Sequence, residues 1–145
     1  MKLIIRTINT INTLVGAILG WYFGNPDGFF NALVTFVIVD YIAGVIRASI
    51  SGKLDSSIGY KGIAKKIMIF VIVGMAHVVD MYVLSEASGL TRTAVIFFYI
   101  SNEGISILEN SHAIGIPIPH LLRKALKKIN TDTIQAEATE QGGDK

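Results

Sequence analysis

Residues 47–66 read RASISGKLDSSIGYKGIAKK, a short basic stretch that lies between two apolar runs. Five of the thirteen Lys and Arg residues of the chain fall within it. As helices, the flanking runs 29–50 and 67–84 are each long enough to cross a hydrocarbon layer of about 30 Å. Short loops rich in Lys and Arg stay on the cytoplasmic side of a membrane. We therefore expect two transmembrane helices joined by a cytoplasmic loop, which orients the remainder of the chain.

The composition of the 145-residue chain indicates an integral membrane protein. Hydrophobic residues make up 51% and charged residues only 17%, which is poorly matched to a surface that faces water. The formal net charge is only +2, and most basic residues lie near expected span ends, so we do not expect a nucleic-acid partner. No cysteine is present, which excludes disulfides and thiolate metal sites.

The first apolar run, 3–23, is predicted to be an uncleaved transmembrane helix. Polar residues interrupt it, and no small-residue cleavage site follows Gly20, unlike in a signal peptide. Small and polar side chains recur every three or four residues and so share one helical face. These residues are Asn9, Asn12, Gly16, Gly20 and Gly24. In lipid such a face favours close helix packing, either within one chain or as self-association between chains, and both alternatives stay open.

Polar side chains also occur inside the other expected spans, 29–50, 67–84 and 90–108. They are Asp40, His77, Asp80, Asn102, Glu103 and Ser106. Such groups must face protein or water, because lipid would leave them without hydrogen-bond partners. We expect them either to pack between helices or to line a wet lumen. His77 and Asp80, at i and i+3, are too few ligands for a convincing metal site.

Two prolines end the fourth span, and a basic amphipathic helix is predicted over 119–130. Its leucines lie along one side and its basic residues along the other, which suits an anionic membrane surface. The predicted membrane-surface basic residues are Lys53, Lys61, Lys65 and Lys66 of the central loop and Arg123, Lys124, Lys127 and Lys128 of this helix. Residues 131–145 are expected to form a polar, disordered tail.

The distribution of basic residues predicts the topology. Four spans place the N-terminus, the central loop and the C-terminus on one side with twelve basic residues, and leave only Arg92 on the other. The expected fold is therefore an all-α integral membrane protein: one membrane domain, 1–130, with four transmembrane helices and both termini cytoplasmic. The alternative is that the first helix lies at the interface and three helices span.

At several of these positions the sequence resembles the phage lysis and toxin-secretion holin family of Gram-positive bacteria and their phages. The residues concerned are Asp40-Tyr41-x-x-Gly44, Ser51-Gly52-Lys53, Ser57, Gly59-x-Lys61-Gly62, Lys65-Lys66, and Asn102-Glu103 with Ser106-Ile107-x-Glu109-Asn110. The resemblance implies a multi-pass protein of the bacterial cytoplasmic membrane that forms homo-oligomers and opens large lesions. An endolysin (a murein hydrolase) or a toxin is the implied cargo, and host cell lysis is the implied outcome.

The residues alone leave a second function open. A small ion or solute channel, or an accessory membrane subunit of a transporter, could use Asp40, His77, Asp80 and Glu103 as a permeation or proton path. No nucleophile and base pair, glycine-rich phosphate loop or metal-ligand cluster stands out in the sequence. We therefore expect neither an enzyme nor a bound cofactor.

Overall fold

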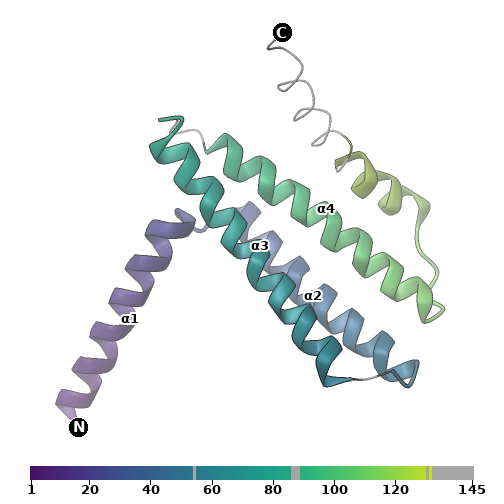
Figure 1. Cartoon of the computed structure of the whole chain (residues 1–145), viewed down its shortest axis with the longest axis horizontal. Helices are drawn as coiled ribbons and strands as arrows, with labels where there is room; N and C mark the ends of the chain where they lie inside the picture. Colours follow the sequence, from purple (N-terminus) through teal and green to yellow (C-terminus); the bar gives the residue numbers. More distant parts are fainter. Residues whose placement is uncertain (54, 86–88, 130, 132–145) are drawn as a thin grey trace.

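The computed structural model describes residues 1–53, 55–85, 89–129 and 131, and within these residues every regular element is a helix. The helices are α1 (Lys2–Phe23), α2 (Gly28–Ile50), α3 (Ser56–Tyr82) and α4 (Leu90–Ala113) (Figure 1). A further helical stretch, 120–129, corresponds to the amphipathic helix predicted over 119–130. Apart from residue 131, the predicted tail lies outside the described residues.

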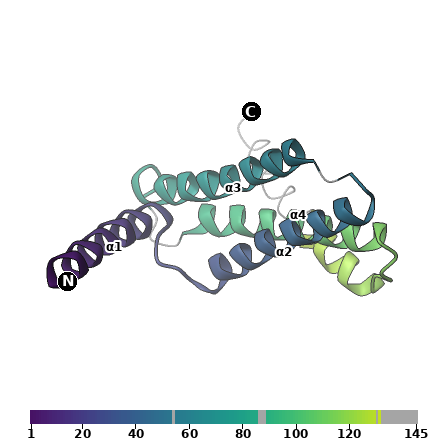
Figure 2. The ribbon, with the colours of Figure 1, turned by 90° about the horizontal axis from the view of Figure 1, so that it is seen from below.

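Three helices form a bundle in which α4 lies between α2 and α3 (Figure 2). α3 runs antiparallel to the other two, so the connection at 51–55 and the end of α4 lie at one end of the bundle. Each helix contributes side chains to one buried apolar cluster. Its members are Leu33 and Val37 of α2, Ile69 and Val73 of α3, and Ile96 and Ile100 of α4. Three apolar runs that are separate in the sequence thus share one common core.

Polar contacts close the opposite end of the bundle. The Asp27 carboxylate caps α2 by accepting a hydrogen bond of 2.8 Å from the Phe30 backbone N–H. Asp80 accepts hydrogen bonds from the backbone N–H groups of Thr91 and Arg92, at 3.0 and 2.8 Å, and so satisfies donors in the first turn of α4. The Arg92 guanidinium, itself buried, donates to Asp27 at 2.6 Å and to the Phe23 carbonyl at 2.7 Å. Arg92 therefore joins α4 to the α1–α2 turn.

α1 is anchored through its last turn and then diverges from the bundle (Figure 1). The Trp21 indole N–H donates to the Tyr82 hydroxyl at 3.1 Å, and the Tyr22 hydroxyl donates to the Val71 carbonyl at 2.8 Å. The Tyr22 ring occupies the space beside Gly74, where a Cβ atom would lie only 1.9 Å from a ring carbon. Residues 1–19, in contrast, are all exposed.

Two helix bounds differ from the sequence prediction. α3 begins at Ser56 rather than at 67, and α4 continues to Ala113 rather than ending at 108. Most of the basic stretch predicted as a loop is therefore the first part of α3, and the connection shrinks to 51–55. Of the Lys residues in this part of α3, Lys61 and Lys65 are exposed, and Lys66 pairs with carboxylates inside the bundle.

Three of the helices are long and apolar enough to cross a membrane, among the residues described: α1, α2 and the part of α3 from Gly59 to Tyr82. α4 is not among these three. It carries Arg92, Glu103 and Glu109, which lower its hydropathy. The predicted span at 90–108 is thus a helix of sufficient length, while the count of four spans and the side on which the termini lie stay predictions.

Candidate functional site

A buried ion-pair cluster joins the three helices of the bundle. Lys66 of α3 donates through its Nζ to Asp40 Oδ2 of α2, at 2.7 Å, and to Glu103 Oε2 of α4. The exposed fractions of the three side chains are 13% for Lys66, 11% for Asp40 and 4% for Glu103. Two carboxylates from distant parts of the sequence therefore share one ammonium group, away from solvent.

A second cation completes this cluster toward the 51–55 end of the bundle. The Asn110 amide donates to Asp40 Oδ1 at 3.3 Å, and Arg47 Nη1 donates to Asn110 Oδ1 at 3.2 Å. The network runs from Glu103 through Lys66, Asp40 and Asn110 to Arg47, and its two carboxylates balance two cations. Burying a charged side chain costs less free energy when opposite charges and hydrogen bonds compensate it, as in this network.

Asp40, Lys66 and Asn110 of this cluster line a cleft between the halves of α2 and α3 that lie nearest the 51–55 connection. The cleft has a volume of about 440 Å³. Its lining includes four small residues, Gly44 and Ala48 from α2 and Gly59 and Gly62 from α3, together with the larger Tyr41 and Val45. Because the four small residues add little bulk, the two helices leave a gap between them here, which we call the α2–α3 cleft.

A separate polar hollow of about 300 Å³ lies between α3 and α4. The residues that line it are Lys65 and Ile69 of α3 and Tyr99, Asn102, Glu103, Ile105, Ser106 and Glu109 of α4. Asn102 and Ser106 are half-buried there, whereas Glu103 is buried. The polar face predicted on the fourth helix is thus divided: Glu103 contributes to the ion-pair cluster, and Asn102 and Ser106 line the hollow.

His77 and Asp80, which the sequence placed on one face, have different partners. The His77 ring lies against Gly24, where a Cβ atom would be 2.9 Å from ring carbon Cε1. Asp80 is buried and caps α4. The structure therefore brings Asp40 and Glu103 together through Lys66 and places His77 and Asp80 near the opposite end of the bundle.

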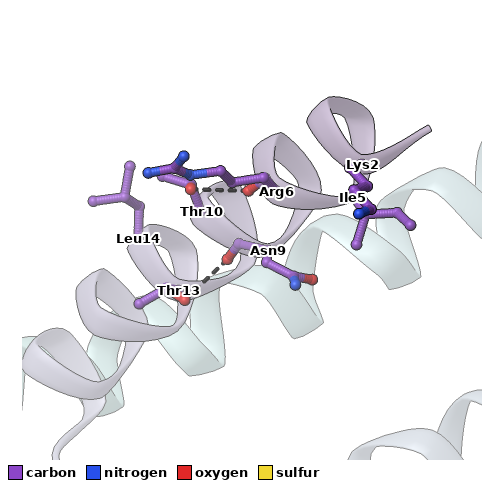
Figure 3. A pocket seen from close by; sticks show the side chains of 7 residues that line it. All are labelled: Lys2, Ile5, Arg6, Asn9, Thr10, Thr13 and Leu14. Carbon is purple, nitrogen blue, oxygen red and sulfur yellow. Dashed lines mark hydrogen bonds between the residues drawn. The ribbon is translucent and has the colours of Figure 1, made fainter.

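The glycine face of α1 is mostly uncovered. A Cβ atom at Gly16 or Gly20 would have no neighbour within 4 Å, whereas Gly24 contacts His77. The Thr10 and Thr13 hydroxyls donate to the carbonyls of Arg6 and Asn9, both at 2.9 Å, beside a shallow hollow on α1 (Figure 3).

These hydroxyls are satisfied within the helix itself, which suits a helix surrounded by lipid. The side-chain amides of Asn9 and Asn12 have no hydrogen-bond partner within the described part of the chain.

The predicted surface lysines and arginines fall into three environments. Lys53, Lys61, Arg123, Lys124, Lys127 and Lys128 are exposed, and their position at a membrane surface stays a prediction. Lys65 lines the α3–α4 hollow and Lys66 is part of the ion-pair cluster. In the helix at 120–129, Leu126 is buried against Gly104 of α4, and its contact with the bundle was not predicted.

Several residues of the site were not singled out from the sequence. Lys66 was assigned to the membrane surface, and Arg47 and Asn110 were given no role in the bundle interior. One signal was available: carboxylates in two different spans require a cationic partner, and Lys66 is the basic residue closest to the start of the third apolar run. No comparable pattern in the sequence indicated that Asp27 pairs with Arg92.

Comparison with known proteins shows relatives along most of the chain. A family model described as the bacteriophage holin family matches residues 17–131. An uncharacterised protein of Listeria monocytogenes is 44% identical over 111 residues, which cover 77% of this chain and 78% of the relative. An uncharacterised 14.9 kDa protein of Clostridium perfringens is 42% identical over 130 residues, 90% of this chain and 98% of the relative. A protein of Bacillus phage phi105 named probable holin is 33% identical over 107 residues, 74% of this chain and 78% of the relative. No solved structure matches.

Proposed function

The chain belongs to the bacteriophage holin family, and on that premise we propose that it is a holin-like membrane protein that oligomerises in the cytoplasmic membrane. The assembled chains open lesions through which an endolysin or a toxin leaves the cell, and lysis of the host cell follows. The partners of the protein are then the lipid bilayer, further copies of itself and its cargo.

The α3–α4 hollow is the observation that carries this proposal. Its lining includes Lys65 and Glu109, which are exposed, and Ser106, which is half-buried. Within a bilayer such a surface needs water or protein against it. One chain of this size cannot enclose a hole wide enough for a folded enzyme. Several chains that turn their α3–α4 hollows toward a common centre would supply a polar wall, while their apolar sides would face lipid.

We propose a topology of four spans with both termini cytoplasmic. The 51–55 connection and the end of α4 lie at one end of the bundle, and Arg47, Lys53 and Lys61 lie in or close to that connection. The ionisable groups inside α4 are compensated, because Glu103 pairs with Lys66 and Arg92 pairs with Asp27. These pairings lower the cost of placing α4 in a membrane, which its composition alone makes unfavourable.

The ion-pair cluster favours a second candidate, a small ion or solute channel or an accessory subunit of a transporter. Asp40, Lys66 and Glu103 place ionisable groups across the middle of the bundle, which is typical of ion and proton paths. Such a protein would alter ion gradients without passing macromolecules.

Release of a folded cytoplasmic reporter enzyme distinguishes the two functions. We expect induced expression of the wild-type chain, together with a cytoplasmic murein hydrolase, to stop growth abruptly and release the reporter. Asn102→Leu with Ser106→Leu should insert normally but lose release, because an apolar wall does not hold a water-filled lumen open. Ala94→Leu adds bulk at an exposed position of α4 outside the α3–α4 hollow and should retain release.

A wild-type chain that dissipates ion gradients and never releases the reporter would favour the channel and contradict the holin function. Normal release by the well-inserted double variant would contradict the lumen-lining role of the α3–α4 hollow.

A further inference from the structure

The helical stretch 120–129, which we call the C-terminal helix, packs against a groove between α2 and α4 (Figures 1 and 2). Leu126 is its one buried residue, with an exposed fraction of 7%. A Cβ atom at Gly104 of α4 would lie 2.9 Å from Leu126 Cδ1 and 3.0 Å from Phe36 Cε1 of α2. The Leu126 side chain therefore fills the space that this glycine leaves.

The docked helix uses only part of its apolar side. Leu121, Leu122 and Leu126 lie on this side, opposite the basic residues. Leu122 lines a hollow of about 190 Å³ that is left in the groove. It stays 47% exposed, and Leu121 stays 79% exposed. A surface that accepted the whole apolar side would bury all three leucines together.

The basic side of the C-terminal helix gains nothing from the docked position. Its four basic residues, Arg123, Lys124, Lys127 and Lys128, are all exposed. No carboxylate in the described part of the chain pairs with any of them. Anionic lipid headgroups would supply the opposite charge that the groove does not provide.

The docked position also fits poorly with a bilayer around α4. Gly104 precedes Ala113, the last residue of α4, by nine residues. Leu126 therefore contacts α4 about 14 Å from the end of that helix. If α4 spans the membrane as proposed, the unpaired basic side chains at this depth must face hydrocarbon or extend toward the headgroups. A bilayer thus favours a different place for the C-terminal helix.

The link at 114–119 allows the helix to change place. Gly115 has a φ of 88°, a conformation that glycine adopts without strain. The Ile116 N–H donates to the Ser111 carbonyl at 3.1 Å, and the Pro119 carbonyl accepts from the Leu122 N–H at 3.1 Å. Within the described part of the chain, no backbone hydrogen bond joins this link to α2 or α3. Movement about the link would leave those two helices undisturbed.

We propose that the C-terminal helix is a cover that anionic lipid removes. It docks in the α2–α4 groove away from anionic lipid, and it moves to an anionic membrane surface when one is present. There the lipid phosphates attract its basic residues, and the boundary between headgroups and acyl chains takes up its leucines. The groove at Gly104 is then left to lipid tails. This inference rests on the proposed location of the bundle in a membrane and not on the opening of lesions.

Intrachain cross-linking of the purified full chain reports whether the helix is docked, since the chain has no native cysteine. Val39→Cys and Leu122→Cys place thiols at two exposed positions that line the same hollow. A short bifunctional thiol reagent should join them in mild non-ionic detergent. Tryptic cleavage identifies the product, and dilution with wild type separates it from cross-links between chains. Asn31→Cys with Leu122→Cys should give little product, because residue 31 lies about 12 Å from residue 39 along α2.

Anionic lipid should lower this cross-linking several-fold. We expect the most product in detergent, less in phosphatidylcholine bilayers and the least in phosphatidylglycerol bilayers, because only the last attract the basic side chains. At about 1 M salt the Debye length is about 3 Å, so the attraction is screened. The product in phosphatidylglycerol should then rise toward the amount in phosphatidylcholine.

Removal of charge gives a matched comparison. Replacing the four basic residues of the C-terminal helix by Gln should give equal product in the two kinds of bilayer, because the attraction to anionic lipid is lost. The control replaces four exposed basic residues elsewhere by Gln and should keep the several-fold difference. These control residues are Lys2, Arg6, Lys53 and Lys61.

Three results would overturn the proposal. Absence of product in detergent would show that the helix does not dock in the groove. Equal product in detergent and in both kinds of bilayer would show that it is a permanent part of the bundle. A several-fold loss in phosphatidylglycerol that persists without the four charges would show that they do not draw the helix away. Reporter release in cells tests the holin function separately and alters none of these results.

Discussion

Removing the charge of Lys66 should destabilise the bundle more than any other single lysine substitution in α3. In Lys66→Met, Asp40 and Glu103 lose the ammonium group between them and are left as neighbouring carboxylates, 11% and 4% exposed. Removing one partner of a buried ion pair costs about 3–5 kcal/mol. That amount is a large part of a total stability of roughly 5–15 kcal/mol. We expect little folded protein in the membrane.

The matched control is Lys61→Met, which removes the same charge from an exposed position of the same helix. An exposed lysine contributes at most about 1 kcal/mol, so this variant should behave like the wild type. A second comparison is Lys66→Met combined with Asp40→Asn and Glu103→Gln. Replacing all three charges removes the unpaired carboxylates and should recover much of the lost stability.

The measurement is the amount of monodisperse protein that survives heating in mild detergent, with membrane abundance measured in parallel. The expected order is wild type and Lys61→Met highest, the triple variant next and Lys66→Met lowest. Equal heat resistance of Lys66→Met and Lys61→Met would refute the reasoning, because it would show that the carboxylates do not depend on Lys66.

Two further predictions concern the ends of the bundle. If both termini are cytoplasmic, a cysteine in Lys53→Cys should be shielded from impermeant thiol reagents in intact cells, and a cysteine in Pro26→Cys should be labelled. The reverse labelling pattern before lysis would show that the topology is the opposite one. Burial raises the pKa of the Asp27 carboxyl group. Hydrogen bonds from the Phe30 backbone N–H and from Arg92, together with the positive charge of Arg92, lower the pKa by more, so that it lies below its ordinary value of 3.8. The carboxylate therefore stabilises the fold at neutral pH and loses this contribution as the pH falls below 3.8. Asp27→Asn should weaken the acid dependence of heat resistance measured in detergent, and an unchanged acid dependence would contradict this role.

Local patterns in the sequence predicted the helices well. The first two were expected at 3–23 and 29–50 and lie at Lys2–Phe23 and Gly28–Ile50. A long apolar run has few alternatives to a helix in lipid, because its backbone groups must bond within the segment. Residues at spacings of three and four share a face of that helix wherever it lies, so the polar stripe of α4 and the glycine stripe of α1 could also be predicted.

The pairing of ionisable groups could not be predicted in this way. Lys66 belongs to a basic stretch, and local sequence gives it the role of a membrane-surface residue. It lies inside the bundle because α2 and α4, which are far apart in the sequence, bring Asp40 and Glu103 to the same depth. Likewise, His77 and Asp80 share a helical face but find different partners on the α1–α2 turn and on α4.

The sequence by itself determined where the apolar helices lie and which of their faces are polar, since both follow from spacing along one helix. It did not determine that residues 56–66 are the first part of α3. Only the tertiary structure decided which polar groups satisfy one another and which are left uncovered. A buried charge takes the partner that helix packing brings within hydrogen-bond distance, and that distance depends on how separate helices align. Lys66 consequently lies between two carboxylates, while the stripe of α1 and the α2–α3 cleft are both left open.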